Sequence, residues 1–149
     1  MLNKLFIDRF IEFGSQGSQC SIEHVRYLQS KQPQTQIFWF KSICNNPLET
    51  FLSLIQSAET NGSDIFVSFD IDSIQSSTCP GVSAPATVGF TAQQALDFAF
   101  HSGKSFNVKL MDLSEYNPVV EEYRTGKLVT QIFYHFLLGR ATAIRDLEK

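Results

Sequence analysis

Apolar and polar positions along the chain follow two alternating patterns. Short, nearly continuous apolar segments predict strands at residues 5–14, 36–43, 64–70 and 106–115. Segments with apolar residues three or four positions apart predict helices at residues 21–31, 45–62, 91–103 and 117–139. A strand–helix order repeated in this way predicts parallel strands joined by right-handed crossovers in a layered α/β domain.

Capping residues support the predicted helix starts. Ser21 precedes the first helix as a candidate N-cap. Asn46 precedes Pro47, and proline is favoured at the first position of a helix. Thr91 and Gln94 have the spacing of a capping box. These three starts therefore look well defined in the sequence.

Glycines suggest where the last two helices end. Gly103 follows the helix that Thr91 begins, and Gly139 follows a segment with apolar residues at positions 128, 132 and 136 and at 129, 133 and 137. Glycine is common just beyond a helix C-terminus. We therefore expect the helices to stop at these two glycines.

Composition places the chain among ordinary globular proteins. Its 149 residues are 43% hydrophobic and 18% charged, with a formal net charge of −3 and no basic block, so we expect no nucleic-acid or membrane partner. No apolar run is long enough to cross a membrane, and charged residues interrupt the first fourteen positions, which make a poor signal peptide. Cys20, Cys44 and Cys79 are far apart, which favours reduced thiols and a cytoplasmic location.

Acidic residues follow two of the predicted strands. Asp70 and Asp72 end the apolar segment 64–70, and they project to the same side if strand geometry persists. Asp112 and Glu115 end the next strand. Carboxyl ends of parallel strands are where open α/β sheets bind ligands, and a hard divalent cation would offset the repulsion between the acids. Asp70 or Asp72 could instead cap a turn or the next helix, and Asp112 could cap a helix or form a loop hydrogen bond. Glu115 could be a first-turn residue that interacts with the helix dipole.

The motifs in this region resemble a known family. The segments "SFDIDSIQSSTCPGVSAPATVGFTAQQA" and "LMDLSEYNP", followed by "FYHFLLG", are similar to the C-terminal half of the arginase, agmatinase and formiminoglutamase family, the ureohydrolases. The wording of "CPGVSAP" and "EEYRTGKLV" is most similar to the eukaryotic formiminoglutamase-like branch, and "FIEFGSQGSQCS" resembles the strand and loop that precede them. The resemblance implies that residues 1–149 are the C-terminal part of a single ureohydrolase domain.

This resemblance implies a fold, a cofactor and a reaction. The fold would be a three-layer αβα arrangement with a parallel sheet, present here as a partial domain with four strands and four helices. The reaction would be hydrolysis of a C–N bond in a formimino or guanidino substrate, a small amidine, with two manganese ions. By resemblance, Asp70 and Asp72 are metal ligands, and Glu115 orients the cationic nitrogen group of the substrate.

The sequence also departs from the family pattern. The family's other ligands come from G-G-x-H and D-x-H-x-D motifs, and neither motif occurs here. We interpret His24, His101 and His135 as helix histidines without a ligand role. Ala84 stands where many arginases have a threonine, which favours formiminoglutamase-like over arginase specificity.

The missing motifs leave three interpretations open. We expect the isolated chain to be inactive, as a fragment of the enzyme. It could also be a non-catalytic α/β protein used for binding or assembly, or half of a split enzyme. The uncovered edge of a partial sheet predicts association, either with an N-terminal half or with further copies of the chain.

Overall fold

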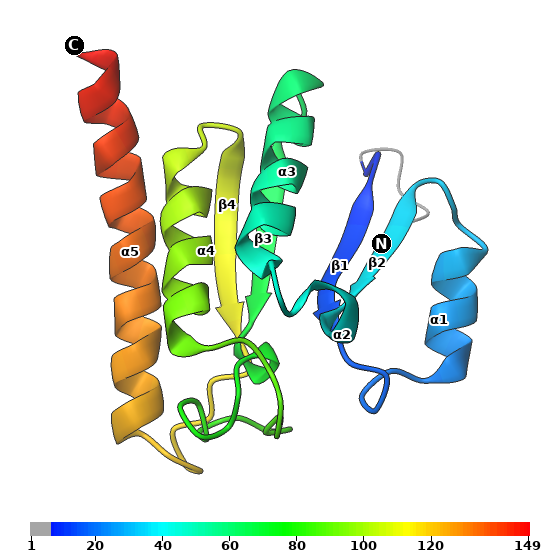
Figure 1. Cartoon of the computed structure of the whole chain (residues 1–149). Coiled ribbons are helices and arrows are strands. Elements are labelled where there is room, and N and C mark those ends of the chain that lie inside the picture. Colours follow the sequence, from blue (N-terminus) through cyan, green and yellow to red (C-terminus); the bar gives the residue numbers. More distant parts are fainter. Residues whose placement is uncertain (1–6) are drawn as a thin grey trace. The chain divides into compact units, whose positions relative to one another are not determined.

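A computed structural model describes residues 7–149, and it divides the chain into two compact units. The first unit extends to Asn46 and the second runs from Pro47 to Lys149. Figure 1 labels the elements of each unit. No helix in the described part of the chain is long and apolar enough to cross a membrane.

The first unit pairs two parallel strands beside a helix. Its elements in chain order are β1 (Phe10–Ser15), α1 (Ile22–Gln29), β2 (Thr35–Trp39) and α2 (Phe40–Ile43). Strand β1 passes through Gly14, whose φ is 85°, and the β1–β2 register shifts there. Gly14 therefore forms a bulge and does not end the strand as expected. The predicted start of this strand at residues 5 and 6 lies outside the described residues.

The second predicted strand is shorter than the sequence indicates. It was expected over residues 36–43, but it ends at Trp39 and the chain turns into the short helix α2. The aromatic run favours a strand throughout, yet the helical turn buries Ile43, which remains only 7% exposed. Local propensity therefore gives way to packing at this point.

The second unit is a βαβ arrangement flanked by helices. Its elements are α3 (Pro47–Thr60), β3 (Ile65–Asp70), the 3-10 helix η1 (Ile71–Ser73), α4 (Ala92–Lys104), β4 (Val108–Ser114) and α5 (Tyr123–Leu147). Strands β3 and β4 are parallel, as expected, with Ser68 opposite Asp112 and Asp70 opposite Ser114. Over residues 7–149 the strands thus form two separate parallel pairs, and the short helices α2 and η1 are the ones that the sequence did not predict.

The predicted helix starts are largely confirmed. The Ser21 side chain accepts a hydrogen bond from the His24 N–H at 3.1 Å. Thr91 and Gln94 form both hydrogen bonds of a capping box, and Pro47 is the first residue of α3. These starts depend on contacts within one turn, which a sequence pattern can specify.

The two glycines expected to end helices lie inside them instead. Helix α4 includes Gly103, and α5 continues beyond Gly139 to Leu147. A Cβ atom at Gly103 would lie 1.9 Å from the carbonyl oxygen of Phe136, and one at Gly139 would lie 2.0 Å from that of Phe100. These glycines therefore allow the backbones of α4 and α5 to approach closely. The helix-stop prediction was wrong because close packing also requires glycine.

Helix α5 also begins later than expected, at Tyr123. Pro118 lies in the preceding segment, where Val120 and Glu121 donate backbone hydrogen bonds to the carbonyl of Asn117. The Glu121 carboxylate accepts from the N–H groups of Arg124 and Thr125 at 2.7 and 2.8 Å. Glu121 therefore satisfies backbone donors in the first helical turn, which otherwise have no partner.

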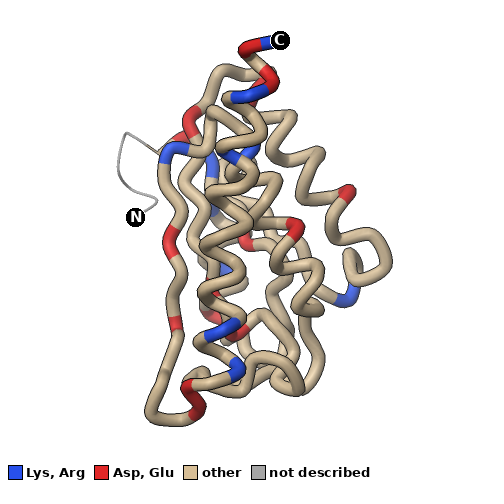
Figure 2. Tube along the Cα trace, turned by 90° about the vertical axis from the view of Figure 1, so that its left-hand side faces the viewer, with Lys and Arg blue, Asp and Glu red and all other residues tan. Residues whose placement is uncertain are grey.

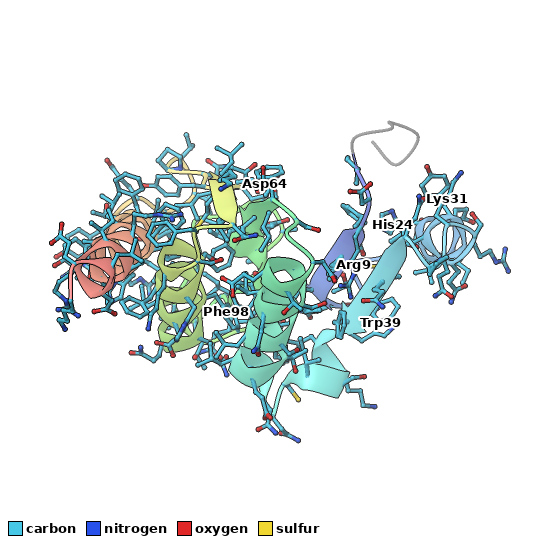
Figure 3. The ribbon with its side chains drawn as sticks, turned by 90° about the horizontal axis from the view of Figure 1, so that it is seen from above. Arg9, His24, Lys31, Trp39, Asp64 and Phe98 are labelled. Carbon is cyan, nitrogen blue, oxygen red and sulfur yellow. The ribbon has the colours of Figure 1, made fainter. Side chains whose placement is uncertain are left out.

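Helices cover one face of the second unit's strands. Seen from above in Figure 3, α3 and α4 lie on the same side of β3 and β4, with α5 beside α4. Phe98 of α4 contacts Phe51 and Phe90, with ring centroids 5.0 and 5.1 Å apart. The opposite face carries Phe66 and Leu110, which are paired across the strands and are 52% and 59% exposed. This sheet is therefore buried on one face only.

Candidate active site

The carboxyl ends of β3 and β4 lie side by side because the strands are parallel. In Figure 1 both arrowheads point to the same end of the second unit, where the loop between η1 and α4 lies. Asp70 is the last residue of β3, and Asp112 is in β4 beside Ser68, whose hydroxyl donates to Asp112 Oδ1 at 2.9 Å. Neither alternative expected for Asp112, a helix cap or a loop hydrogen bond, describes this cross-strand contact.

The chain turns immediately after Asp70. This residue caps η1, and its Oδ1 accepts a hydrogen bond from the Asp72 N–H at 2.9 Å. Strand geometry therefore does not persist from Asp70 to Asp72, and the argument that strand alternation aligns them was wrong. The turn-capping alternative is correct for Asp70. It uses one carboxylate oxygen of Asp70 and holds both acids on one tight turn.

Asp72 has a carboxylate oxygen without a partner. Its Oδ2 accepts from the Ala84 N–H at 3.2 Å. Its Oδ1 is buried, and no hydrogen-bond partner for it exists among the described residues. A buried polar atom in this state destabilises the fold unless a further group satisfies it.

Burial and neighbouring acids raise the pKa values of Asp70 and Asp72. Burial is the largest cause of the raised pKa of Asp70, and the charges of Glu115 and Asp112 add to it. Burial also raises the pKa of Asp72, followed by the charges of Asp70 and Glu115. The structure therefore brings Asp70, Asp72 and Glu115 within electrostatic reach of one another.

No basic side chain in residues 7–149 forms an ion pair with these acids. The ion pairs of the described chain involve Glu12, Asp64 and Asp146 instead. Along the trace in Figure 2, Lys and Arg positions are scattered and do not form a basic stretch. The cluster at the strand ends thus remains an uncompensated concentration of negative charge.

Glu115 has an unusual backbone conformation. Its φ is 69°, in the left-handed region that favours glycine, and it is the only non-glycine residue of the described chain with a positive φ. Just beyond it, Tyr116 pairs with Val82, and the Asn117 N–H donates to the Gly81 carbonyl at 2.8 Å. These contacts hold the strained residue in place, a combination that is frequent at functional sites.

The proline- and glycine-containing loop is fixed by contacts that the sequence did not reveal. The Gly81 N–H donates to Thr125 Oγ1 at 2.8 Å, and that hydroxyl donates to Glu121 Oε2. A Cβ atom at Gly81 would lie 2.1 Å from the carbonyl oxygen of Glu121. Thr125 and Glu121 thereby anchor the loop that carries Ala84 to Asp72. The acid near the start of α5 was the one available signal for this anchor.

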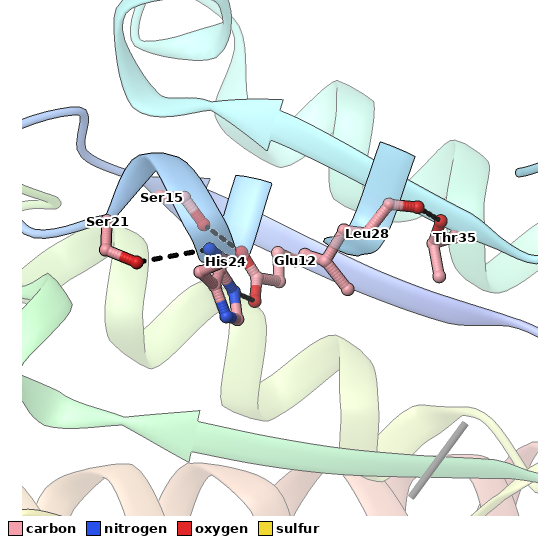
Figure 4. A network of polar contacts seen from close by, with 6 residues as sticks. All are labelled: Glu12, Ser15, Ser21, His24, Leu28 and Thr35. Carbon is pink, nitrogen blue, oxygen red and sulfur yellow. Dashed lines mark hydrogen bonds and ion pairs between the residues drawn. The ribbon is translucent and has the colours of Figure 1, made fainter. Parts of the chain in front are cut away.

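Cysteine and histidine residues add no metal site to this region. Cys79 is fully buried, and burial, followed by the charge of Asp72, raises the pKa of its thiol to about 11, as is typical of a packed, unreactive thiol. His24 contacts Glu12 at 2.5 Å in the first unit, as Figure 4 shows, and His135 Nδ1 contacts the Gln131 carbonyl. Within residues 7–149, no group of three or more His, Cys, Asp or Glu residues is arranged to hold a metal ion.

These features define an α/β protein with an acidic cluster at the carboxyl ends of parallel strands, where such folds bind ligands. The sequence profile of the arginase family matches residues 3–139, and the chain belongs to the arginase family. The arginase-like α/β fold predicted from the sequence is thereby confirmed in partial form.

Known relatives resemble this chain over only part of their length. The formiminoglutamase of Trypanosoma cruzi, solved with Mn²⁺, is 41% identical with a TM-score of 0.83, and the alignment covers 95% of this chain and 48% of that one. The formimidoylglutamase of Paraburkholderia xenovorans is 28% identical over 87 residues, which are 58% of this chain and 27% of that protein. The arginase of Entamoeba histolytica, solved in complex with L-ornithine, is 25% identical with a TM-score of 0.75, over 87% of this chain and 42% of that one. The chain therefore spans about half the length of these relatives or less.

Proposed function

We propose that this chain is the C-terminal part of a formiminoglutamase-like hydrolase domain, and that Asp70 and Asp72 bind manganese in the complete domain. The observation that carries the proposal is the buried Asp72 Oδ1, which has no partner among the described residues and lies beside other acids. A cation would satisfy this oxygen and offset the repulsion among the carboxylates.

The residues present fit part of a manganese site. Carboxylate oxygens are the ligands that hard divalent ions such as manganese prefer. Asp70 and Asp72 supply two carboxylates on one turn, but no described group of three candidate ligands exists. When bound in pairs, such metals activate a water molecule for hydrolysis. We infer that this chain provides some of the ligands and that the G-G-x-H and D-x-H-x-D motifs of the family provide the rest.

Glu115 is proposed to bind the cationic group of the substrate. A planar formimino or guanidino cation is recognised well by a carboxylate, which accepts two parallel hydrogen bonds. Glu115 is exposed at the strand end and its charge reaches both aspartates. Its strained backbone supports a role that requires this side chain at this position.

The substrate class rests on the relatives and on one residue. The relatives from T. cruzi and P. xenovorans carry the names formiminoglutamase and formimidoylglutamase. Ala84 stands where many arginases have a threonine, and this difference in side chain supports a formimino substrate over arginine. We place the protein in the cytoplasm because its cysteines are unpaired.

A non-catalytic role in binding or assembly is the second candidate. The absence of a complete ligand group within residues 7–149 favours it over an active isolated chain. In that case the acids would be remnants, and replacing them with neutral residues would not change the binding of any metal ion. Manganese binding therefore separates the two candidates.

The proposal is tested by titrating Mn²⁺ into the 149-residue chain and following free Mn²⁺ by electron paramagnetic resonance. We expect weak binding that is lost in the Asp70→Asn/Asp72→Asn variant and retained in Glu115→Gln. Glu12→Gln, which neutralises an acid of the first unit, is the matched control and should bind as the native chain does.

Formiminoglutamate hydrolysis is measured on the same samples, and the isolated chain should show none. Equal Mn²⁺ binding by the native chain and the double variant would contradict the proposed ligands. Two tightly bound ions together with turnover would show that the ligand set is complete, and that His101 or His135 had been wrongly dismissed.

A further inference from the structure

Gly81 joins three segments of the second unit. Its N–H donates to Thr125 Oγ1, in the first turn of α5, at 2.8 Å. Its carbonyl accepts a hydrogen bond from the N–H of Asn117, which follows β4, at 2.8 Å. The loop that follows η1 is therefore held from two sides, and both backbone polar groups of this buried glycine have partners in other segments.

The hydroxyl of Thr125 is fixed in direction by Glu121. Thr125 is fully buried, and its hydroxyl donates its one proton to Glu121 Oε2 at 2.8 Å. Hydrogen bonds from the N–H groups of Arg124 and Thr125 lower the pKa of Glu121 to about 2, so that at neutral pH this carboxylate is ionised and can only accept. The oxygen of the Thr125 hydroxyl is thereby left to accept from the Gly81 N–H.

The backbone of the loop approaches α5 so closely that its position depends on this contact. A Cβ atom at Gly81 would lie 2.1 Å from the carbonyl oxygen of Glu121 and 2.8 Å from Thr125 Oγ1. Removal of the Thr125 hydroxyl would leave the Gly81 N–H as a buried donor without this acceptor, which is unfavourable. We therefore expect the loop to move away from α5 when the hydroxyl is absent.

The anchored loop reaches both parts of the candidate site. Further along the loop, the Ala84 N–H donates to Asp72 Oδ2 at 3.2 Å, while Asp72 Oδ1 has no partner among the described residues. Next to Gly81, Val82 pairs with Tyr116, the residue that follows Glu115. The loop thus connects the proposed metal ligand Asp72 with the carboxylate that is proposed to bind the substrate.

We propose that Thr125 is a positioning residue, which acts through Gly81 to fix Asp72 relative to Glu115. Thr125 acts on the site through the loop and binds no ion itself. The inference rests on the proposed function for its effect on manganese, because groups that orient a metal ligand typically change metal affinity about 10- to 100-fold when they are lost. Its effect on the loop requires no bound ion and is measured separately.

The first test is hydrogen exchange of the metal-free 149-residue chain, followed by NMR. Thr125→Val replaces the hydroxyl with a methyl group of similar size, and should accelerate exchange of the Ala84 and Asn117 amides by about 10-fold, although neither amide bonds to Thr125. Thr125→Ser keeps the hydroxyl and should restore the native rates. The Phe90 amide, which donates to the Ser73 carbonyl at 2.9 Å, should exchange at the native rate in both variants and thereby exclude general destabilisation.

The second test is the affinity of the same variants for Mn²⁺, measured by electron paramagnetic resonance. Thr125→Val should weaken binding about 10-fold, and Thr125→Ser should bind as the native chain does. Thr35→Val is the matched control, because Thr35 is also a buried threonine, and its hydroxyl donates to the Leu28 carbonyl in the first unit. This control should change neither the Mn²⁺ affinity nor the exchange of the Asn117 amide.

Glu121→Gln keeps the test independent of whether Thr125→Val folds. It weakens the same contact, so exchange of the Ala84 and Asn117 amides should accelerate by a smaller factor. Native exchange rates in these variants, equal acceleration in Thr125→Ser, or faster exchange without weaker Mn²⁺ binding would each overturn the positioning role. If the native chain binds no Mn²⁺, the proposed metal ligands are wrong, and the exchange rates of the metal-free variants alone decide whether Thr125 holds Asp72 and the segment after β4 together.

Discussion

The acidic residues on the two parallel strand pairs of this protein have contrasting surroundings. In the first unit, Glu12 of β1 accepts a hydrogen bond from Ser15 at 3.1 Å and contacts His24 of α1 at 2.5 Å, a network drawn in Figure 4. In the second unit, Asp72 has a buried oxygen without a described partner, and burial, followed by the charges of Asp70 and Glu115, raises the pKa of its carboxyl group.

Backbone geometry shows the same contrast. The left-handed position of β1 is occupied by Gly14, with φ 85°, which has no side chain to strain it. The left-handed position after β4 is occupied by Glu115, with φ 69°. The first unit satisfies its polar groups locally, whereas the second retains charge and strain. This difference is the physical reason for placing the candidate site at the end of β3 and β4.

The largest expected effect concerns the close approach of α4 and α5. Gly139→Ala should lower the free energy of unfolding by about 2–4 kcal/mol, because its Cβ would lie 2.0 Å from the Phe100 carbonyl oxygen. Helix propensity alone would favour alanine by about 1 kcal/mol. Gly17→Ala in the first unit, where a Cβ would meet nothing within 4 Å, is the control and should change stability by less than about 0.5 kcal/mol. Urea denaturation measures both, and similar values would refute the packing argument.

Exchanging the two left-handed residues should have opposite effects. Gly14→Ala should destabilise the protein by about 1–2 kcal/mol, because the added Cβ is strained at φ 85°. Glu115→Gly should stabilise it by up to about 1 kcal/mol, since relief of strain exceeds the entropy lost by glycine. Both changes are measurable by urea denaturation. Destabilisation by Glu115→Gly would show that this carboxylate supports the fold.

Neutralising one acid in each unit should change the melting temperature in opposite directions. In metal-free buffer at pH 7, Asp72→Asn should raise the melting temperature by about 1–4 °C, because it keeps an acceptor for Ala84 and removes a repelled charge. Glu12→Gln should lower the melting temperature, because it weakens contacts to Ser15 and His24. Calorimetry measures the melting temperature of both variants. Shifts of the same sign in the two variants would contradict the contrast between the units.

The smallest expected effect concerns Glu121, an acid of the second unit whose carboxylate accepts hydrogen bonds. Hydrogen bonds from the N–H groups of Arg124 and Thr125 lower the pKa of Glu121 to about 2. A pKa lowered in the folded state contributes stability above the unfolded value of about 4.5, and that contribution is lost as pH falls toward 2. At pH 6, the melting temperature of Glu121→Gln should therefore be lower than that of the native protein. This difference in melting temperature should be smaller at pH 3. A gap that is independent of pH would contradict this account.

Sequence patterns predicted the parts of the fold that depend on local contacts. The capping box of Thr91 and Gln94 lies within one turn, and both of its hydrogen bonds are present. The parallel pairing of β3 and β4 followed from the strand–helix order and was confirmed. Motif resemblance predicted the family, which the profile match over residues 3–139 confirms.

Features that depend on distant contacts were not predicted. Gly139 looked like a helix stop because the sequence cannot show that the Phe100 carbonyl lies against it. The hydrogen bond by which Thr125 anchors Gly81 spans 44 positions, and only the acid near the start of α5 hinted at it. The convergence of the acids was predicted correctly from the strand ends, but the turn at residues 71–73 that orients them was not. Their roles as ligands remain predictions.

Paramagnetic broadening by Mn²⁺ in the ¹⁵N NMR spectrum tests the central claim most directly, because it locates even a weakly bound ion. We predict that substoichiometric Mn²⁺ broadens the amide signals of residues 70–73, 84 and 113–116 most strongly. This broadening should disappear in the Asp70→Asn/Asp72→Asn variant. Broadening centred on Glu12 and His24, or broadening that persists unchanged in the double variant, would contradict the assignment of the cation site to the ends of β3 and β4.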